Sequence, residues 1–263
     1  MRIRNYSERT IGSYLCSVKQ ISRHYNLSPG KITVSQFKSY LYFLIQREQA
    51  SVSRINQLIS AWKILQQDIL KRKWEDLIIK RPRREKKLPV ILTVQEAKTL
   101  INAPLNLKHR ILLILTYATG MRRNEVLNIR LKDIDRNRKI VKITGKGNKQ
   151  REIPLSDNLL ALLTDYYKRY LPSVFLFEGN IPGKAYSAAS MAKIVKDAAA
   201  KAAIKKNISA HILRHSFATH MLEEGVNLKR LQLLLGHNSM KTTSVYLHLA
   251  DVDKVKLPDL ITS

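Results

Sequence analysis

The sequence predicts a mainly helical protein of two domains, with a small β-hairpin in the second domain. At 263 residues, the chain is long enough for two domains that each bury a core of their own. Apolar residues recur at helical spacing through most of the chain, and a basic, proline-containing segment at residues 79–89 interrupts this pattern. Between residues 139 and 155 the pattern changes to that of short β-strands.

The N-terminal residues 1–78 predict a small all-helical domain. Their apolar positions recur three or four residues apart in three stretches, at residues 11–21, 37–45 and 58–69. Thr33 and Gln36 have the spacing of a capping box, so a helix is expected to begin just after Thr33.

Residues 79–91 predict a basic linker between the domains. The stretch contains two prolines, a dense run of positive charge and little that could be buried. Such a run is often simply solvated, but in this basic chain we expect it to lie along phosphates. The candidate phosphate contacts are Lys80, Arg81, Arg83, Arg84, Lys86 and Lys87.

Residues 92–263 predict a mixed α/β domain that ends in a tail. Thr93 and Glu96 have the spacing of a second capping box, and helical patterns continue to about residue 130. Two short strands then flank the glycine-rich, basic tip Gly145–Lys149, which indicates a hairpin. Helical patterns resume in four stretches, at residues 159–170, 190–203, 209–223 and 228–235.

The composition limits the classes of partner and site. Lys and Arg number 47 against 20 Asp and Glu, and the net charge of +27 favours a polyanion, with double-stranded DNA as the first candidate. No apolar stretch is long enough to span a membrane and the N-terminus lacks a signal-peptide core, so we expect a cytoplasmic, nucleoid-associated protein. Cys16 is the only cysteine, which excludes an intrachain disulfide and a cysteine-based zinc cluster.

Several groups in the second domain suit the cleavage of a phosphodiester. That reaction requires a nucleophile, cations around the phosphate and a proton donor for the departing oxygen. Each group alone has an ordinary explanation as a surface charge or a packed side chain, but their joint occurrence in a basic two-domain chain indicates DNA strand cleavage. The candidates are Arg122 after a glycine, Lys146 on the hairpin tip, His211 and Arg214 at i and i+3 on one helix, His237 after a helix-ending glycine, and Tyr246.

The stretch HILRHSFATHMLEEGVNLKRLQLLLGHNSMKTTSVYLHL, which begins at His211, resembles the signature region of the tyrosine recombinases of the phage-integrase and Xer type. The resemblance covers essentially the whole chain and is densest from Thr119 to His248. It implies a SAM-like helical core-binding domain over residues 1–78 and a mixed α/β catalytic domain over residues 92–263.

The resemblance also implies a role for each candidate. Arg122 and Arg214 would bind the nonbridging oxygens of the scissile phosphate, which suits planar guanidinium groups. Tyr246 would attack the phosphate to give a 3'-phosphotyrosine, with His211 assisting removal of its proton. The remaining roles are a hydrogen bond to the phosphate from His237, protonation of the leaving 5'-oxygen by Lys146, and DNA binding by Lys149.

This chemistry implies no cofactor and no metal. The glycine-containing loop at residues 179–185 lacks the Ser or Thr of a nucleotide-binding P-loop. His211 and His215 are spaced i and i+4, but Ile212 stands where the zinc-protease pattern needs a glutamate. His215, His220 and His248 are expected to support the site or the helix packing.

Two other functions and the assembly remain open at this point. A type IB topoisomerase would use a similar residue set, and a nonenzymatic DNA-binding regulator would explain the charge but not the catalytic set. For a recombinase, the family implies a homotetramer in the synaptic complex that exchanges strands through a Holliday junction, and a monomer or dimer when free. The tail after Asp251 either packs on its own domain or docks on a neighbouring protomer. The target site and the biological setting are not readable from the sequence.

Overall fold

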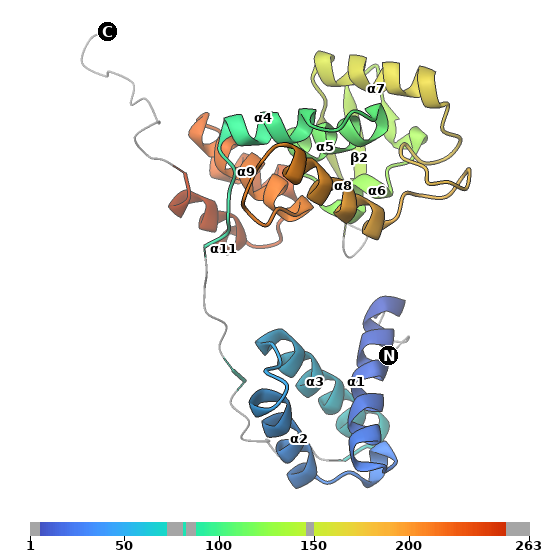
Figure 1. Ribbon diagram of the computed structural model, residues 1–263, viewed down its shortest axis with the longest axis vertical. Helices are drawn as coiled ribbons and strands as arrows, with labels where there is room; N and C mark the ends of the chain where they lie inside the picture. Colours follow the sequence, from blue (N-terminus) through green and yellow to red (C-terminus); the bar gives the residue numbers. More distant parts are fainter. Residues whose placement is uncertain (1–5, 73–80, 83–87, 146–149, 251–263) are drawn as a thin grey trace, which may run out of the picture. The chain divides into compact units, whose positions relative to one another are not determined.

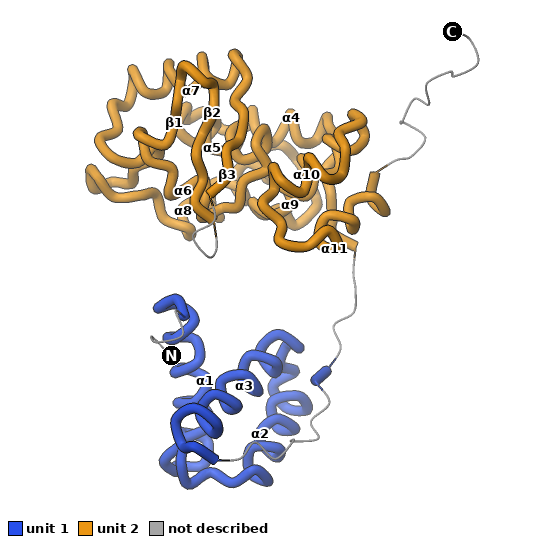
Figure 2. The backbone as a smooth tube through the Cα atoms, turned by 180° about the vertical axis from the view of Figure 1, so that it is seen from behind, with its two compact units in different colours: residues 1–87 blue, residues 88–263 orange. Residues whose placement is uncertain are grey.

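The computed structural model describes residues 6–72, 81–82, 88–145 and 150–250, and the statements that follow concern these residues. The chain divides into two compact units, residues 1–87 and residues 88–263 (Figure 2). Each unit has a hydrophobic core of its own. The protein is mostly helical with one small antiparallel sheet, which confirms the predicted fold class.

The first unit is a small helical domain, drawn in blue in Figure 1. Serine or threonine side chains cap its helices, and the predicted capping box of Thr33 and Gln36 is formed. The rings of Phe37 and Trp62 stack at 4.6 Å in the centre of the core, and both side chains are fully buried. The elements are α1 (Glu8–Tyr25), the 3₁₀ turn η2 (Pro29–Lys31), α2 (Val34–Gln46), α3 (Val52–Ile64) and the π-helical turn η3 (Leu65–Ile69).

The second unit places helices around a three-stranded sheet. The chain begins with α4 (Val94–Asn102), whose predicted capping box of Thr93 and Glu96 is also formed. The elements that follow are α5 (Leu107–Thr119), α6 (Arg123–Leu127), η4 (Leu131–Asp133), β1 (Ile134–Asp135), β2 (Ile140–Thr144), β3 (Gln150–Pro154), α7 (Asp157–Tyr170), α8 (Ala188–Lys201), α9 (Ala210–Glu223), α10 (Leu228–Leu235), α11 (Met240–Thr243) and η5 (Ser244–His248).

The sheet has the order β1-β2-β3 and is antiparallel throughout. Strands β2 and β3 form the predicted hairpin, with Val141 opposite Ile153, and the side chains of both residues enter the core. The two-residue strand β1 was not predicted, because it is too short to show an alternating pattern. The hairpin tip, residues 146–149, lies outside the described residues.

Helix α9 is the central helix of the second unit. It packs against α4, α5, α8, α10 and η5, and most of its residues are buried. The segment ahead of α4 is fixed on it, since the Leu92 N–H donates to Ser216 Oγ at 2.9 Å and the Leu92 carbonyl accepts from His220 Nε2 at 2.9 Å. A second apolar cluster joins α9 to α10 and η5, and it includes Phe217, Leu235 and Tyr246. These contacts place η5 beside α9.

Candidate active site

Arginine, histidine and tyrosine side chains from four elements meet at one end of α9. Arg122 precedes α6, Arg214 and His215 lie on α9, His237 follows α10, and Tyr246 lies in η5. The elements converge because α5 and α10 both end at glycines beside α9. The structure thus brings together four of the predicted site residues, Arg122, Arg214, His237 and Tyr246.

Arg214 is held by backbone carbonyls at the ends of two helices. Its Nη1 donates to Gly120 O at 2.6 Å, and its Nη2 donates to Leu235 O at 2.7 Å. Helix C-termini leave carbonyl groups without intrahelical partners and carry partial negative charge, so a guanidinium is well placed there. Burial, with the Arg122 charge adding to it, lowers the pKa of Arg214 to about 10, which leaves the side chain protonated at neutral pH.

The two glycines that end α5 and α10 have positive φ angles, +59° at Gly120 and +62° at Gly236. A Cβ atom at Gly120 would lie 2.2 Å from Cδ1 of Phe217, and one at Gly236 would lie 3.0 Å from Nη1 of Arg151. Both positions therefore require glycine for backbone conformation and for space. The two glycines therefore determine where α5 and α10 end, and with it the positions of the carbonyl groups that hold Arg214.

Arg122 lies at the edge of the site and is held by a carboxylate. Its Nη1 donates to Glu125 Oε1 at 2.9 Å, its backbone N–H donates to Glu125 Oε2 at 2.8 Å, and its Nη2 donates to Gly236 O at 3.2 Å. The side chain keeps 38% of its surface exposed, in contrast to Arg214, which is 3% exposed. Arg122 can therefore present N–H groups to a ligand without leaving its support.

Glu125 also accepts a bidentate pair of hydrogen bonds from Arg151 of β3, at 3.0 and 2.7 Å, as a fork-shaped guanidinium allows. Burial raises the pKa of Glu125, but the hydrogen bonds from Arg151 and from the Arg122 backbone outweigh it and leave the pKa at about 2. Arg151 Nε donates further to Leu234 O at 2.9 Å. A single carboxylate thus connects α6, the hairpin and the end of α10.

Glu125 and Arg151 were not among the predicted site residues, although the sequence carries a signal for each. Glu125 follows Arg122 by three residues, the position of the glutamate in a capping box. Arg151 lies two residues before Ile153 in a strand, so alternation places both side chains on the buried face. A charged residue on a buried face indicates a partner of opposite charge.

His237 contacts both Arg214 and the buried Thr243. Its Nε2 lies 2.9 Å from Arg214 Nη2, and its Nδ1 lies 3.0 Å from Thr243 Oγ1. Burial, with the charges of Arg214 and Arg122, lowers the pKa of His237 to about 4, so the ring is neutral at neutral pH. Because Arg214 can only donate, Nε2 accepts and Nδ1 carries the proton, which it donates to Thr243.

Tyr246 is 3% exposed and lies against both α9 and His237. Its hydroxyl is 2.9 Å from Nδ1 of His215. Its ring is nearly parallel to that of His237, with the centroids 6.3 Å apart. Burial raises the pKa of Tyr246, and the charges of Arg214 and Arg122 oppose this effect.

The other predicted histidines lie elsewhere. His211 is exposed one turn before His215, and the two rings are 6.5 Å apart, so the histidine that contacts the Tyr246 hydroxyl is His215. His220 is a buried packing residue that accepts from the Tyr117 hydroxyl at 2.8 Å. His248 is exposed in η5.

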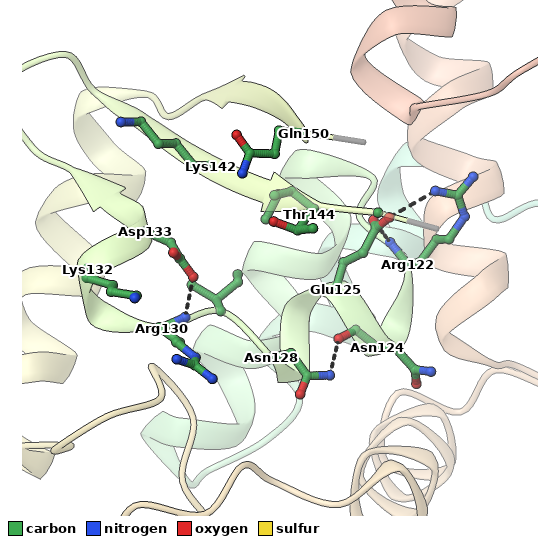
Figure 3. Close-up of a pocket in the computed structure, with 13 residues that line it drawn as sticks. Arg122, Asn124, Glu125, Asn128, Arg130, Lys132, Asp133, Lys142, Thr144 and Gln150 are labelled. Carbon is green, nitrogen blue, oxygen red and sulfur yellow. Dashed lines mark hydrogen bonds and ion pairs between the residues drawn. The ribbon is translucent and has the colours of Figure 1, made fainter. Parts of the chain in front are cut away.

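Two hollows flank Arg122, with volumes of about 690 and 620 Å³. Gly145 and Gln150, which precede and follow the hairpin tip, line both of them together with Arg122. Figure 3 shows the larger hollow, with Gln150 and Lys142 on the strands and the Arg122–Glu125 pair at its edge. Gly145 and Gln150 therefore both lie near Arg122.

Part of the predicted set cannot be placed. Lys146, Lys149, five of the linker residues (Lys80, Arg83, Arg84, Lys86 and Lys87) and the tail lie outside the described residues. Arg81 is described, and its guanidinium donates to Ser60 Oγ of α3 at 3.3 Å.

Within the described part of the chain, no three His, Cys, Asp or Glu side chains are grouped as metal ligands. Nor does any helix described there have the length and apolar character needed to cross a membrane.

Comparisons with known proteins match both units. Residues 90–252 match the Phage integrase family, and residues 1–76 match the N-terminal SAM-like domain of phage integrases. The chain is a tyrosine recombinase of the phage integrase family. The tyrosine recombinase XerD of Staphylococcus epidermidis is 35% identical over 266 residues, which cover 93% of this chain and 89% of XerD.

Another relative and two solved structures are also similar to this chain over most of its length. A protein of Sinorhizobium fredii named putative integrase/recombinase y4qK is 33% identical, over 95% of this chain and 82% of its own length. The crystal structure of the XerA recombinase is 29% identical with a TM-score of 0.58, over 96% of this chain and 91% of XerA. A lambda integrase dimer bound to a core site shares the fold of this recombinase, with a TM-score of 0.73 at 18% identity over 92% of this chain and 89% of that one.

Proposed function

We propose that this recombinase binds double-stranded DNA at a specific site and exchanges strands through a 3'-phosphotyrosine at Tyr246 and a Holliday junction. The observation that carries the proposal is the buried Tyr246, whose ring lies nearly parallel to that of His237 and whose hydroxyl is subject to the charges of Arg214 and Arg122. A buried tyrosine beside two guanidinium groups suits attack on an anion that those groups bind.

The two arginines bind the nonbridging oxygens of the scissile phosphate. Arg122 offers its exposed N–H groups while Glu125 keeps its position. The N–H group of Arg214 that faces His237 in the free chain turns to the phosphate. The carbonyl groups at two helix ends stabilise the positive charge of Arg214. His237 then carries its proton on Nε2 and donates it to the phosphate, while Nδ1 accepts from the Thr243 hydroxyl.

Lys146 donates the proton to the departing 5'-oxygen. The support for this role is the position of Gly145 and Gln150, which border the tip and line the hollows beside Arg122. The reaction needs neither metal nor ATP, because the phosphotyrosine keeps the energy of the broken bond and a 5'-hydroxyl can reverse the attack.

DNA binding extends beyond the active site. The net charge of +27 favours a duplex that contacts both a core-binding domain at residues 1–78 and a catalytic domain at residues 92–263. The linker cations, Arg81 among them, and Lys149 contact phosphates. Four protomers and two DNA sites form the synaptic complex, and the tail is the candidate link between neighbouring protomers.

A comparison of the wild-type protein with Tyr246→Phe in cells tests the proposal. Denaturing purification should recover DNA covalently attached to the wild-type protein, and sequencing of that DNA identifies the site. The variant should bind the recovered site in gel-shift assays with unchanged affinity but form no covalent adduct. An adduct on the variant would refute Tyr246 as the nucleophile, and relaxation of supercoiled DNA without strand exchange would indicate a topoisomerase instead.

A further inference from the structure

The larger hollow beside Arg122 is lined mostly by polar and positively charged side chains. It has a volume of about 690 Å³, and the exposed side chains of Lys132 and Lys142 line it together with Arg122. Figure 3 shows the two lysines on one side of the hollow and Arg122 on the other. We propose that Lys142 and Lys132 bind backbone phosphates of the cleaved strand next to the scissile phosphate; this inference rests on the proposed function.

The carboxylates near the two lysines already have other partners. Glu152 lies opposite Lys142 in the pairing of β2 with β3, but both of its oxygens accept from Arg138, at 3.1 and 2.9 Å. Asp133, which lines the hollow, accepts from the backbone N–H three residues earlier at 2.9 Å. Among the described residues, neither Lys132 nor Lys142 forms an ion pair. Their charges can therefore attract an anion that enters the hollow.

The other charged groups of the hollow add to its positive charge. The single carboxylate of Glu125 is shared by two guanidinium groups, those of Arg122 and Arg151, so this cluster is positive on balance. The guanidinium carbon of Arg130 lies 5.5 Å from the ring centroid of Phe175, a contact that leaves its charge uncompensated. A polyanionic chain that is bound at Arg122 therefore meets further cations along the hollow.

The geometry of β2 limits how far the Lys142 contact lies from the cleaved bond. Lys142 and Thr144 share the outward face of β2, and Gly145 follows directly and lines both hollows beside Arg122. Three residues of strand span about 10 Å. A DNA strand carries one phosphate per about 3.4 Å of helix axis, so Lys142 reaches a phosphate within about three nucleotides of the scissile one.

Contacts of this kind position the substrate. An ammonium group is a compact charge that suits a phosphate oxygen, and a phosphate contact carries no information about the base. Such contacts instead fix the register of a protein on the duplex. Lys142 and Lys132 thus hold the strand so that the scissile phosphate, and not its neighbour, meets Arg122.

Neutral phosphate analogues test the contact directly. The substrate is the site recovered from cells, with a single uncharged methylphosphonate placed in turn at each phosphate of the cleaved strand around the scissile one. Gel shifts at several salt concentrations give the affinity of Lys142→Gln, in the Tyr246→Phe background so that no cleavage intervenes. The matched control is Lys168→Gln, which removes the same charge from an exposed position of α7 outside both hollows.

On the unmodified site we expect Lys142→Gln to weaken binding by about 5-fold to 10-fold, as for one charge-assisted contact at an exposed position. The slope of log affinity against log salt should become shallower by about 0.9, the value for one phosphate. A methylphosphonate within about three nucleotides of the cleaved bond should abolish this loss, because the lysine then has no charge to bind. Lys132→Gln should behave in the same way at another phosphate of that strand.

Two results would overturn the inference. The first is a loss for Lys142→Gln that is the same with every methylphosphonate, since the lysine would then act only through the overall charge of the protein. The second is an equal loss and an equal change of salt slope for Lys168→Gln. The proposed function fails separately, if Tyr246→Phe still forms an adduct. If wild-type protein forms the adduct on Tyr246 and either of the two results is found, only this inference fails.

Discussion

The two arginines of the site are held by different kinds of partner. Arg214 is buried, and besides its contact with His237 it is held by the backbone carbonyls of Gly120 and Leu235, which no side-chain substitution removes directly. Arg122 lies at the edge and depends on the carboxylate of Glu125, which can be substituted or protonated. We call the part of the site around Arg214 the α9–α10 side; backbone carbonyls hold its arginine in place. We call the part around Arg122, Glu125 and Arg151 the α6–β3 side; ion pairs with the Glu125 carboxylate hold its arginines in place.

The largest effect is expected on the α6–β3 side from Glu125→Gln. The change leaves the 12%-exposed Arg151 without its carboxylate partner, and loss of one partner of a buried pair typically costs about 3 to 5 kcal/mol in unfolding free energy. The control is Glu152→Gln, which breaks the exposed pair with Arg138 and should cost no more than about 1 kcal/mol. Urea unfolding followed by circular dichroism gives both values, and equal losses would contradict the contrast.

On the α9–α10 side, Gly120→Ala should cost about 2 to 4 kcal/mol, the sum of left-handed backbone strain and overpacking against Phe217. Gly225→Ala separates the two terms, because Gly225 has a φ of +81° but no heavy atom within 4 Å of a new Cβ. We expect about 1 to 2 kcal/mol for that control. If the two variants lose the same stability in urea unfolding, the close approach of Phe217 is not what requires glycine.

The pH dependence of stability should distinguish the two sides. His215 and His237 have pKa values of about 4, below the ordinary 6.5, so the unfolded chain takes up protons first as the pH falls. The contribution of these two histidines to the unfolding free energy is complete above pH 6.5 and is lost as the pH falls to about 4. Glu125 has a pKa of about 2 against the ordinary 4.5, so its contribution is complete above pH 4.5 and is lost as the pH falls to 2.

The measurement is the unfolding free energy of wild type, His237→Asn and Glu125→Gln from pH 7 to pH 3. His237→Asn should flatten the pH dependence between 6.5 and 4, and Glu125→Gln should flatten it below 4.5, by up to about 1.4 kcal/mol per pH unit. Trp62 and Trp74 both lie in residues 1–87, so tryptophan fluorescence follows the first unit as an internal control. Flattening in the same pH range for both variants would show that the two sides titrate as one.

The sequence predicts what local spacing determines. Thr33 with Gln36 marks a real helix start, and the change of period after residue 138 marks a real hairpin. The spacing of His211 and Arg214 predicts one helix, but it cannot tell whether His211 or His215 meets Tyr246. That choice depends on how η5 packs on α9, which is a contact between residues 31 positions apart.

The roles of charged residues in the core are the least predictable part of the site. Arg151 looks like one more cation among 47 basic residues, and only the burial of the neighbouring Ile153 indicates that it needs a partner. Its partner Glu125 lies 26 residues away in sequence. Alternation and capping patterns are local, so they can flag each residue but cannot pair them.

The smallest effect is expected from Thr243→Val, which tests the α9–α10 side at the side-chain contact between Thr243 and His237. Valine keeps the shape of the fully buried Thr243 but removes the hydroxyl that fixes the His237 ring, so unfolding free energy should fall by about 1 kcal/mol, as for a typical lost hydrogen bond. Thr243→Ser keeps the hydroxyl and serves as the control for cleavage. The Thr243 hydroxyl is proposed to set the His237 tautomer that donates to the phosphate. In that case the cleavage rate of Thr243→Val should fall by more than its loss of stability explains. The cleavage rate of Thr243→Ser should stay close to that of the wild type. Equal cleavage rates for the two variants would show that Arg214 alone orients His237.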